Sequence, residues 1–224
     1  PIFHSLEVDG MGVKSAFFQV WDSRGKLWAA SDEGLLCYNG YQSKILKASS
    51  TDLHSPLSDK VRSIYEVQPD EFWLTYRDQK SISKFDPIKN TFKHFHTDTL
   101  NPNRIAEVDL AKIVFDTDST RWLLTWGEGL CRLNIENEHA VFYKNDDQQI
   151  LDGEPPANFV KDLIKINDDL YLCAFFLEHP NSKPYYFVPS TRKFSPFDFE
   201  PYLQKLDERM AQLIRTSLSI VNFI

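Results

Sequence analysis

The sequence lacks any concentrated run of basic residues and any long apolar run. Its 25 Lys and Arg residues are scattered among 32 Asp and Glu residues, and the formal net charge is −7. Binding to nucleic-acid phosphates needs clustered Lys and Arg, so we expect no nucleic-acid partner. The apolar runs are strand-sized, far below the ~20 residues of a membrane-spanning helix, so we expect this segment to make no membrane contact.

The motifs of common catalytic and metal sites are also missing. The sequence has neither a G-x-S-x-G nucleophile elbow nor a glycine-rich phosphate loop. Cys37, Cys131 and Cys173 are widely spaced and form no C-x-x-C pair, which favours buried strand residues over a zinc site and leaves their redox state open. We therefore assign no catalytic residue, no metal and no cofactor, and expect the segment itself not to be an enzyme.

Two short patterns invite a metal hypothesis. His94 and His96 fall on one face of a predicted strand, but no third ligand accompanies them, which favours a solvated outer strand. The segment Asp116-Thr-Asp118-Ser-Thr offers carboxylates between two predicted strands. A calcium loop needs more oxygen ligands and a terminal Glu, so an ordinary hairpin turn is the preferred interpretation.

Bulky rings recur at nearly equal spacing. Trp28, Trp73, Trp122 and Tyr171 each head an apolar run, with steps of 45 to 49 residues between them. Each period also contains several short strands joined by turns, such as the hairpin signal Asn39-Gly40. A fixed period in this range with several strands per repeat predicts an all-β fold, a β-propeller made of four-stranded antiparallel blades.

The pattern predicts four complete blades and the start of a fifth, within one partial propeller that covers residues 1–224. After Pro201, apolar residues at three- and four-residue spacing predict a helical insertion at 202–218. Residues 219–224 return to strand character and read as the first strand of a fifth blade, so the propeller is expected to be incomplete and to be closed by chain outside this segment. The four expected blades are 16–47, 61–97, 110–145 and 159–198.

The repeats resemble those of the two-component regulator propeller family, whose pattern is V-x-S-I-x-E-D-x-x-G-x-L-W-I-G-T-x-x-G-L-x-R-Y-D. The second blade matches through VRSIYE and the following Phe72-Trp73. The first matches at Asp22, Gly25, Leu27, Trp28, Gly34, Leu35 and Tyr38, and the third at Ile113, Asp116, Trp122, Thr125, Gly129, Leu130 and Arg132.

That resemblance implies a location and a role. Such propellers are commonly the extracytoplasmic, periplasmic sensing half of a hybrid histidine kinase, often in bacteria that sense products of glycan breakdown. The resemblance therefore implies two partners, the remainder of the propeller and a downstream kinase module. It also implies an oligosaccharide as the ligand.

In a four-stranded blade the loops after the second and fourth strands lie on one face, where propellers usually bind ligands. Aromatic rings beside carboxylates and an Arg suit a sugar, which stacks on the rings and hydrogen-bonds to the charged groups. The alternative is that Tyr76 and Trp126 only pack between blades. The candidate ligand-binding residues in these loops are Asp32, Tyr76, Arg77, Trp126, Glu128 and Glu178.

Two classes of function fit this sequence. The first is a ligand-sensing propeller of a signalling receptor. The second is a non-catalytic protein-interaction or dimerisation scaffold, in which the same face binds a polypeptide or a second copy of the chain. An enzyme such as a propeller lyase or glycosidase ranks third, because paired catalytic carboxylates cannot be placed from spacing alone. The sequence leaves open the identity of the ligand, the number of blades, the output domain and the oligomeric state.

Overall fold

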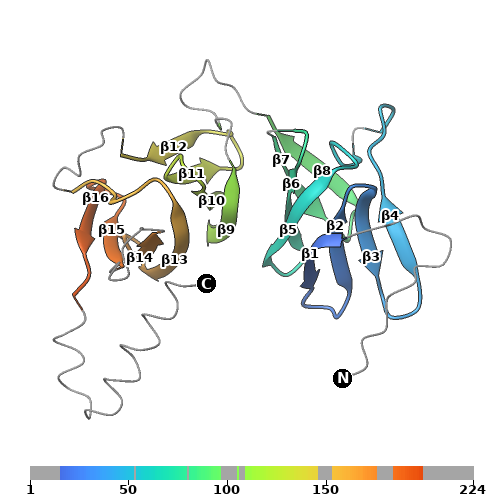
Figure 1. The fold of residues 1–224 in the computed structure, drawn as a ribbon, viewed down its shortest axis with the longest axis horizontal. Helices are drawn as coiled ribbons and strands as arrows, with labels where there is room; N and C mark the ends of the chain where they lie inside the picture. Colours follow the sequence, from blue (N-terminus) through green and yellow to red (C-terminus); the bar gives the residue numbers. More distant parts are fainter. Residues whose placement is uncertain are drawn as a thin grey trace, which may run out of the picture. The chain divides into compact units, whose positions relative to one another are not determined.

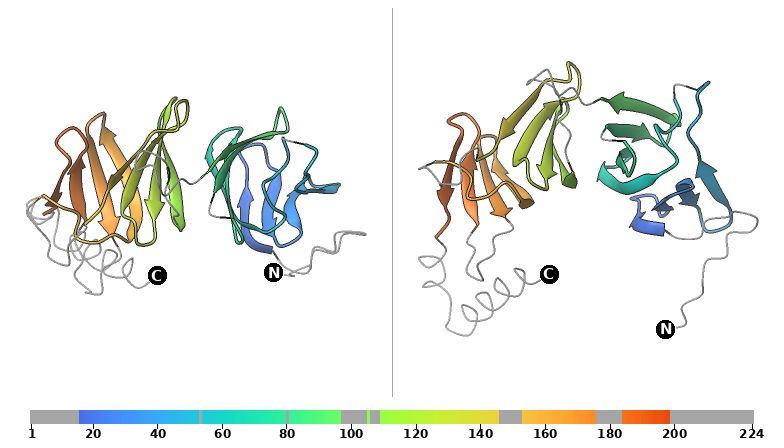
Figure 2. Two further views of the ribbon diagram at one scale, coloured as in Figure 1. Left: turned by 90° about the horizontal axis from the view of Figure 1, so that it is seen from above. Right: turned by 45° about the horizontal axis from the view of Figure 1, so that its top comes forward.

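A computed structural model describes residues 16–52, 54–79, 81–96, 105, 109–145, 153–175 and 184–198. The chain divides into two compact units, Pro1–Glu107 and Val108–Ile224, called unit 1 and unit 2. Each unit is described by itself. Within each unit, two four-stranded sheets have their strands side by side in chain order (Figures 1 and 2).

Unit 1 contains blades 1 and 2, and all neighbouring strands in them pair antiparallel. Blade 1 consists of β1 (Ala16–Trp21), β2 (Leu27–Ser31), β3 (Gly34–Tyr38) and β4 (Ser43–Leu46). Blade 2 consists of β5 (Val61–Gln68), β6 (Glu71–Tyr76), β7 (Ile82–Asp86) and β8 (Thr91–Phe95).

Unit 2 contains blades 3 and 4, with the same antiparallel order. Blade 3 consists of β9 (Leu110–Thr117), β10 (Thr120–Thr125), β11 (Leu130–Asn134) and β12 (Ala140–Tyr143). Blade 4 consists of β13 (Val160–Asn167), β14 (Leu170–Phe175), β15 (Tyr185–Val188) and β16 (Lys193–Pro196).

These sheets confirm the predicted all-β class built from four-stranded antiparallel blades. The predicted helix at 202–218 and the predicted fifth-blade strand at 219–224 lie outside the described residues. In the described part of the chain, no helix has the length and hydrophobicity to cross a bilayer.

An indole ring joins the two blades of unit 1. Trp28 of β2 packs against Phe72 of β6 and Phe85 of β7, with ring centroids 5.3 Å apart in both cases. Phe85 in turn stacks on Phe92 at 4.4 Å. A single sheet buries a face only by packing against another layer, so these rings form the common core of blades 1 and 2.

Unit 2 repeats this arrangement. Trp122 of β10 packs against Tyr171 of β14 at 5.3 Å and against Phe187 of β15 at 5.6 Å. Phe187 stacks on Phe194 at 4.3 Å, as Phe85 does on Phe92. The core of unit 2 is therefore built from the same kinds of ring at corresponding strands.

The strand register corrects one sequence-based assignment. Trp28, Trp73 and Trp122 stand three residues before the end of their strands, whereas Tyr171 stands four residues before the end of β14, as Phe72 does in β6. Because side chains alternate along a strand, this shift of one residue reverses the face. Tyr171 is therefore the counterpart of Phe72. Each of these rings packs against the tryptophan of the preceding blade, so Tyr171 is not a fourth member of the tryptophan series.

Two glycines close the loops that follow the second strands of blades 1 and 3. Gly34 has φ 133° and Gly129 has φ 75°, and a Cβ at these positions would lie 2.5 Å from the carbonyl oxygen of Leu46 or 2.3 Å from that of Tyr143. No side chain fits so close to a neighbouring backbone. Both positions therefore require glycine.

We expect Gly129→Ala to destabilise the protein more than Gly25→Ala. Gly25 also has positive φ, 77°, but a Cβ there meets nothing within 4 Å, so it carries only the conformational cost of about 1 kcal/mol. The clash with Tyr143 should bring the cost at Gly129 to about 2 kcal/mol or more. Urea denaturation of both variants measures the difference; equal midpoints would contradict this account of the loop.

Candidate functional site

Three of the predicted ligand-binding residues occupy one position in three blades. β2 ends at Ser31, β6 at Tyr76 and β10 at Thr125, so Asp32, Arg77 and Trp126 are each the first residue after the second strand. The strand pattern places all three on the same rim of their blades. In this position the backbone is fixed by the sheet while the side chain is free to vary between blades.

In unit 1 the structure brings Asp32 and Arg77 together. An Arg77 Nη1 atom lies 3.4 Å from an Asp32 carboxylate oxygen, and the two side chains are 48% and 44% exposed. An ion pair this exposed contributes at most about 1 kcal/mol to stability. The pair therefore adds little to the stability of unit 1.

Tyr76, the residue before Arg77, is buried, with 4% of its surface exposed. Its hydroxyl donates a hydrogen bond to Ser83 Oγ at 2.8 Å and accepts one from the Leu57 amide at 3.2 Å. Burial raises the pKa of Tyr76, against the opposing effect of these hydrogen bonds. For this ring the structure favours the packing alternative that the sequence left open.

In unit 2 the corresponding position holds an exposed aromatic pair. Trp126 is 42% exposed and Phe159 is 46% exposed, and their ring centroids lie 6.3 Å apart in an edge-to-face arrangement. The two residues also form an isolated antiparallel β-bridge. Two large rings thus stand next to each other at the surface, joined through their backbone.

The backbone around Trp126 is held by several hydrogen bonds. The Trp126 amide donates to the Asp109 carbonyl at 2.8 Å, and the Gly127 and Gly129 amides donate to the Asn158 carbonyl at 3.1 and 2.9 Å. Asn158 is itself fixed, because its side chain exchanges two hydrogen bonds of 2.7 Å with the backbone of Asn145. The ring pair is therefore presented on a rigid platform.

Glu128 lies in the same loop as Trp126. Its amide donates to Thr125 Oγ1 at 3.0 Å, and its carboxylate is 3.7 Å from Lys144 Nζ, with both side chains close to 40% exposed. A carboxylate and an ammonium group thus accompany the two rings. Glu178, the remaining predicted residue, lies outside the described residues.

Phe159 is a site residue that the sequence reasoning missed. It immediately precedes Val160, the first residue of β13, as Lys60 precedes Val61 of β5. In unit 1 the residues after the second strand of one blade and before the first strand of the next are Asp32 and Lys60, so this pair corresponds to Trp126 and Phe159. The signal available in the sequence was a Phe where the equivalent blade has a Lys.

The segment that suggested a calcium loop is the turn of the β9–β10 hairpin. Asp116 is buried and forms hydrogen bonds inside unit 2. Its carboxylate accepts hydrogen bonds from Tyr171, from Thr120 at 2.8 Å and from Arg132 at 2.8 and 3.0 Å. Lys165 of blade 4 lies 3.5 Å away. Burial alone would raise the pKa of Asp116, but these hydrogen bonds outweigh it and hold the pKa below its ordinary value.

The two histidines of blade 2 hydrogen-bond to serines. His94 is half-buried with its Nδ1 2.7 Å from Ser83 Oγ, so it is less solvated than expected, while His96 is exposed with its Nδ1 3.3 Å from Ser81 Oγ. Burial and the neighbouring His96 lower the pKa of His94. Among the described residues, no three His, Cys, Asp or Glu side chains come together as metal ligands.

The three cysteines are free thiols. Cys131 and Cys173 are buried, as the sequence predicted, and Cys37 is partly buried. Burial raises the pKa of all three thiols. Since the thiolate is the nucleophilic form, burial makes these thiols less reactive than an exposed cysteine.

No family model and no curated protein matches the sequence. Solved structures do share the fold. The extracellular domain of BT3049, described as a hybrid two-component system of B. thetaiotaomicron, aligns over 84% of this chain with 14% identity and a TM-score of 0.62. The extracellular domain of BT4673, described in the same way and from the same organism, aligns over 85% with 17% identity and a TM-score of 0.56.

A third neighbour is PorZ, a surface component of the type-IX secretion system of Porphyromonas gingivalis. It aligns over 84% of this chain with 14% identity and a TM-score of 0.54. The alignments cover 25%, 26% and 23% of these three proteins, so this chain spans about a quarter of their length. At these identities the comparisons establish a shared fold.

We expect Asp116→Asn to lower stability at pH 7 and to flatten its dependence on pH. A carboxylate whose pKa is lowered on folding contributes stability that is complete above the ordinary Asp value of about 3.9 and is lost as the pH falls from there toward the folded pKa. Urea denaturation at pH 7, 5, 4 and 3 should show a steeper acid loss for the wild type than for the variant. Asp118→Asn removes an exposed carboxylate from the same turn and should leave the wild-type profile; parallel profiles for all three proteins would contradict the role of Asp116.

Proposed function

We propose that this chain is part of an extracytoplasmic, ligand-sensing β-propeller of a bacterial two-component receptor. Three observations support the proposal: the four-stranded blades, the repeat resemblance carried by Trp28, Gly34, Trp122 and Gly129, and the shared fold with extracellular domains described as two-component systems. The remainder of the propeller and a downstream kinase module are its partners in the same receptor. Its place is the periplasm.

The exposed pair of Trp126 and Phe159 is the observation that carries the ligand-binding part of the proposal. Leaving two large rings in water forgoes the hydrophobic stabilisation of burying them, and at the same two positions unit 1 has Asp32 and Lys60. A sugar ring covers such aromatic faces, while its hydroxyl groups hydrogen-bond to groups such as Glu128 and Lys144. The ligand we propose is a glycan-derived oligosaccharide.

Binding transmits a signal only if the ligand distinguishes two states of the receptor. The loop of Trp126 is tied through Asn158 to the segment that leads from blade 3 into blade 4. A ligand that spans Trp126 and Phe159 therefore stabilises one arrangement of these two blades. This preference biases the receptor and, through it, the kinase.

A protein-interaction or dimerisation scaffold is the second candidate function. Near the end of β13, Ile164 and Ile166 are 57% and 51% exposed. Exposed apolar side chains of this kind are typical of surfaces that bind another protein. Light scattering distinguishes the candidates, because a stable dimer that no oligosaccharide perturbs favours the scaffold.

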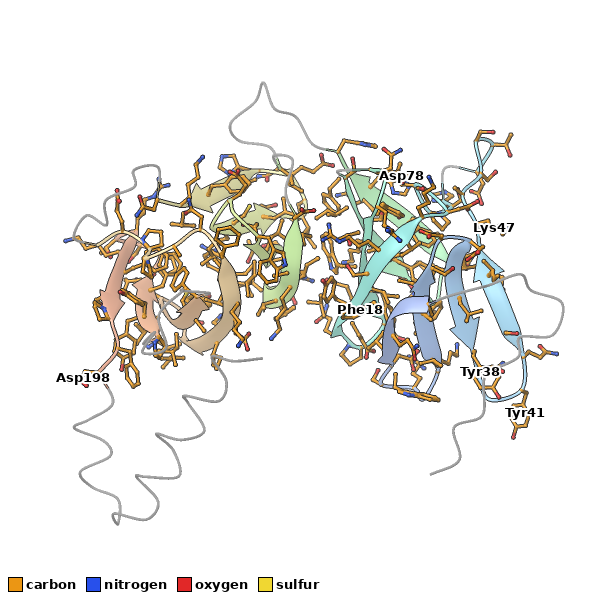
Figure 3. The ribbon with its side chains drawn as sticks, in the orientation of Figure 1. Phe18, Tyr38, Tyr41, Lys47, Asp78 and Asp198 are labelled. Atoms are coloured by element: carbon orange, nitrogen blue, oxygen red, sulfur yellow. The ribbon has the colours of Figure 1, made fainter. Side chains whose placement is uncertain are left out.

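We expect Trp126→Ala and Phe159→Ala each to weaken oligosaccharide binding by about tenfold without unfolding the protein, because each removes a stacking surface. Isothermal titration calorimetry with neutral and anionic oligosaccharides of two to six sugar units measures the affinity. Tyr41→Ala is the matched control, since Tyr41 is 94% exposed on the β3–β4 turn of unit 1 and projects away from its sheet (Figure 3). Unchanged affinity in both ring variants would refute this site.

A further inference from the structure

A chain of hydrogen bonds ties blade 2 to the segment that precedes it in unit 1. This segment, residues 54–60, leads into β5 and is called the entry segment. The Leu57 amide donates to the Tyr76 hydroxyl at 3.2 Å, and that hydroxyl donates to Ser83 Oγ at 2.8 Å. Ser83 Oγ lies 2.7 Å from Nδ1 of His94. The chain therefore runs from the entry segment through β6 and β7 to β8.

The direction of these bonds fixes the protonation state of His94. Tyr76 accepts from the Leu57 amide and donates its one hydrogen to Ser83, which leaves the Ser83 hydrogen for His94. Nδ1 is then the acceptor, and the ring is neutral with its proton on Nε2. The ring also hydrogen-bonds to the backbone of Ser55, a bond that favours the protonated ring and so identifies the ring as the donor. Both ends of the chain therefore hold the entry segment.

A proton on Nδ1 does not fit this chain. Three contacts link the four groups and hold three hydrogens, so a protonated Nδ1 brings a fourth hydrogen that has no acceptor. Ser83 is completely buried and Tyr76 is 4% exposed, so water does not reach the surplus hydrogen. In the described part of the chain, the two hydroxyls contact no other acceptor. A buried donor without an acceptor is costly, and protonation of His94 therefore weakens the chain.

The charged groups around His94 do not favour its cation. Burial and His96, whose ring centroid is 6.2 Å away in the same strand, lower the pKa of His94, against the opposing effect of the Ser55 backbone. The carboxylates on either side of Ser55, Asp52 and Asp59, accept hydrogen bonds from backbone amides of the same connection. They are therefore engaged with the backbone rather than with the imidazole.

The remaining cationic groups of the neighbouring elements also point elsewhere. Lys84 and Lys93 are paired with each other across β7 and β8, and the alternation of side chains places them on the opposite face of blade 2 from His94. In the entry segment, His54 and Lys60 are exposed. Among the described residues, His94 therefore takes part in no ion pair that would stabilise its positive charge.

Unit 2 shows that the fold does not require these polar groups. Phe175 stands four residues after Tyr171 in β14, as Tyr76 stands four residues after Phe72 in β6. Phe175 and Tyr76 are equally buried, so the ring is repeated and the hydroxyl is not. A buried polar chain at a position where an apolar ring suffices indicates a role other than filling the core.

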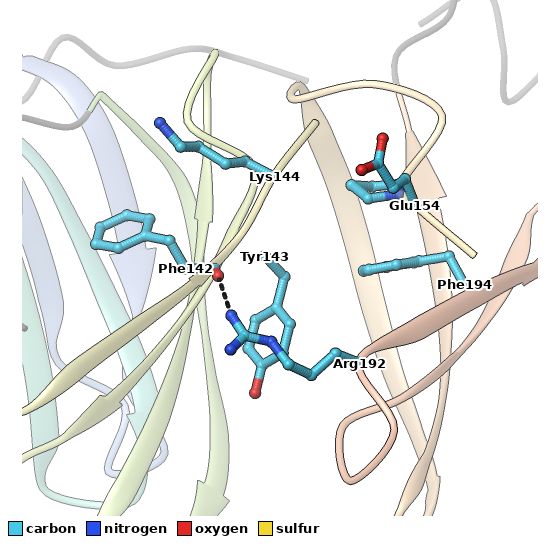
Figure 4. Close-up of a pocket in the computed structure, with 7 residues that line it drawn as sticks. Phe142, Tyr143, Lys144, Glu154, Arg192 and Phe194 are labelled. Carbon is cyan, nitrogen blue, oxygen red and sulfur yellow. Dashed lines mark hydrogen bonds between the residues drawn. The ribbon is translucent and has the colours of Figure 1, made fainter. Parts of the chain in front are cut away.

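Blades 3 and 4 of unit 2 are joined across a cleft of about 240 Å³ by a group that does not titrate. Arg192, in the β15–β16 turn, donates from Nη2 to the carbonyl of Phe142 in β12 at 3.1 Å (Figure 4). A guanidinium keeps its charge at every physiological pH. This connection is therefore insensitive to acid, whereas the one in unit 1 passes through a histidine.

We propose that His94 is an acid-sensitive latch of unit 1. When the medium becomes acidic, a proton on His94 breaks the chain through Ser83 and Tyr76, and the entry segment opens away from blade 2. The entry segment ends at Lys60, whose carbonyl accepts a hydrogen bond from the Arg77 amide at 2.9 Å, so the opening reaches the rim of blade 2. This response to pH does not depend on the oligosaccharide proposed above.

Acid favours the open form because the open form binds the proton more tightly. In the open form the imidazole of His94 is solvated and has the ordinary histidine pKa of about 6.5. In the closed form its pKa is lower. The closed form is therefore fully stabilised above this ordinary value and loses stability as the pH falls from there toward the lower pKa.

NMR on the 224-residue protein labelled with ¹⁵N tests the latch. At pH 8 the imidazole resonances of His94 should show the tautomer with its proton on Nε2. Hydrogen exchange of the Leu57 amide, corrected for the intrinsic rate, should lose about fivefold or more in protection between pH 7.5 and pH 5.0. This loss should have the same midpoint as the titration of His94.

Two amides of the same molecule separate the latch from general acid unfolding. The Asn145 amide, in the connection after β12, donates to the side chain of Asn158 at 2.7 Å, and this side chain does not titrate. Leu74 lies in β6, at the centre of blade 2. Both amides should keep their protection at pH 5.0.

A pair of variants identifies the titrating group. In His94→Asn, the amide oxygen replaces Nδ1 as the acceptor for Ser83 but takes up no proton, so the protection of Leu57 should no longer change with pH. His96→Asn is the matched control, because it removes the other histidine of β8 and leaves the chain intact. In this control the loss of protection at Leu57 should persist.

Several results would overturn the proposal. They are a His94 tautomer with its proton on Nδ1 at pH 8, protection of Leu57 that does not change with pH, and an equal loss at Asn145 or Leu74. A persistent loss in a folded His94→Asn variant, or its absence in His96→Asn, would do the same. If His94→Asn fails to fold, the wild type decides, because a Leu57 midpoint that differs from the His94 titration would overturn the latch.

Discussion

Each unit of this protein depends on the packing of one indole ring against the next blade. A four-stranded sheet cannot bury its own faces, and Trp28 in unit 1 and Trp122 in unit 2 supply the contact that makes two sheets one core. Trp122 is completely buried. Burial of such a ring is a major source of stability, and its edge-to-face contacts with Tyr171 and Phe187 add about 0.5–1.5 kcal/mol each.

This constant core leaves the rims of the blades free to differ. The residue after the second strand is Asp32, Arg77 or Trp126. In all three blades this residue comes four positions after the tryptophan of that strand. In unit 1 this position and its neighbour before the next blade carry charge, and in unit 2 they carry the rings of Trp126 and Phe159. The same repeated framework thus presents different side chains at its rims, while the residues that stabilise the fold stay alike.

The sequence predicted what is local and repeated, and missed what depends on pairing between distant segments. The spacing of the tryptophans located the first three blades. Gly34 and Gly129 could be assigned to loops because they occupy the same place in the repeat. The position of Tyr171 was wrong because a one-residue shift in register cannot be read from spacing. The burial of Tyr76 and the pairing of Trp126 with Phe159 are set by contacts between strands and loops far apart in the chain, which no local pattern records.

The central claim is that the buried indole makes the two blades of a unit one cooperative structure. Hydrogen exchange on a Trp122→Ala variant tests it most directly, with the protection of amides in β10 and in β14 followed separately. If the indole joins the blades, β14 loses protection together with β10, although the substitution lies in β10 alone. Wild-type protection in β14 beside a destabilised β10 would show that the blades stand independently and would contradict the account.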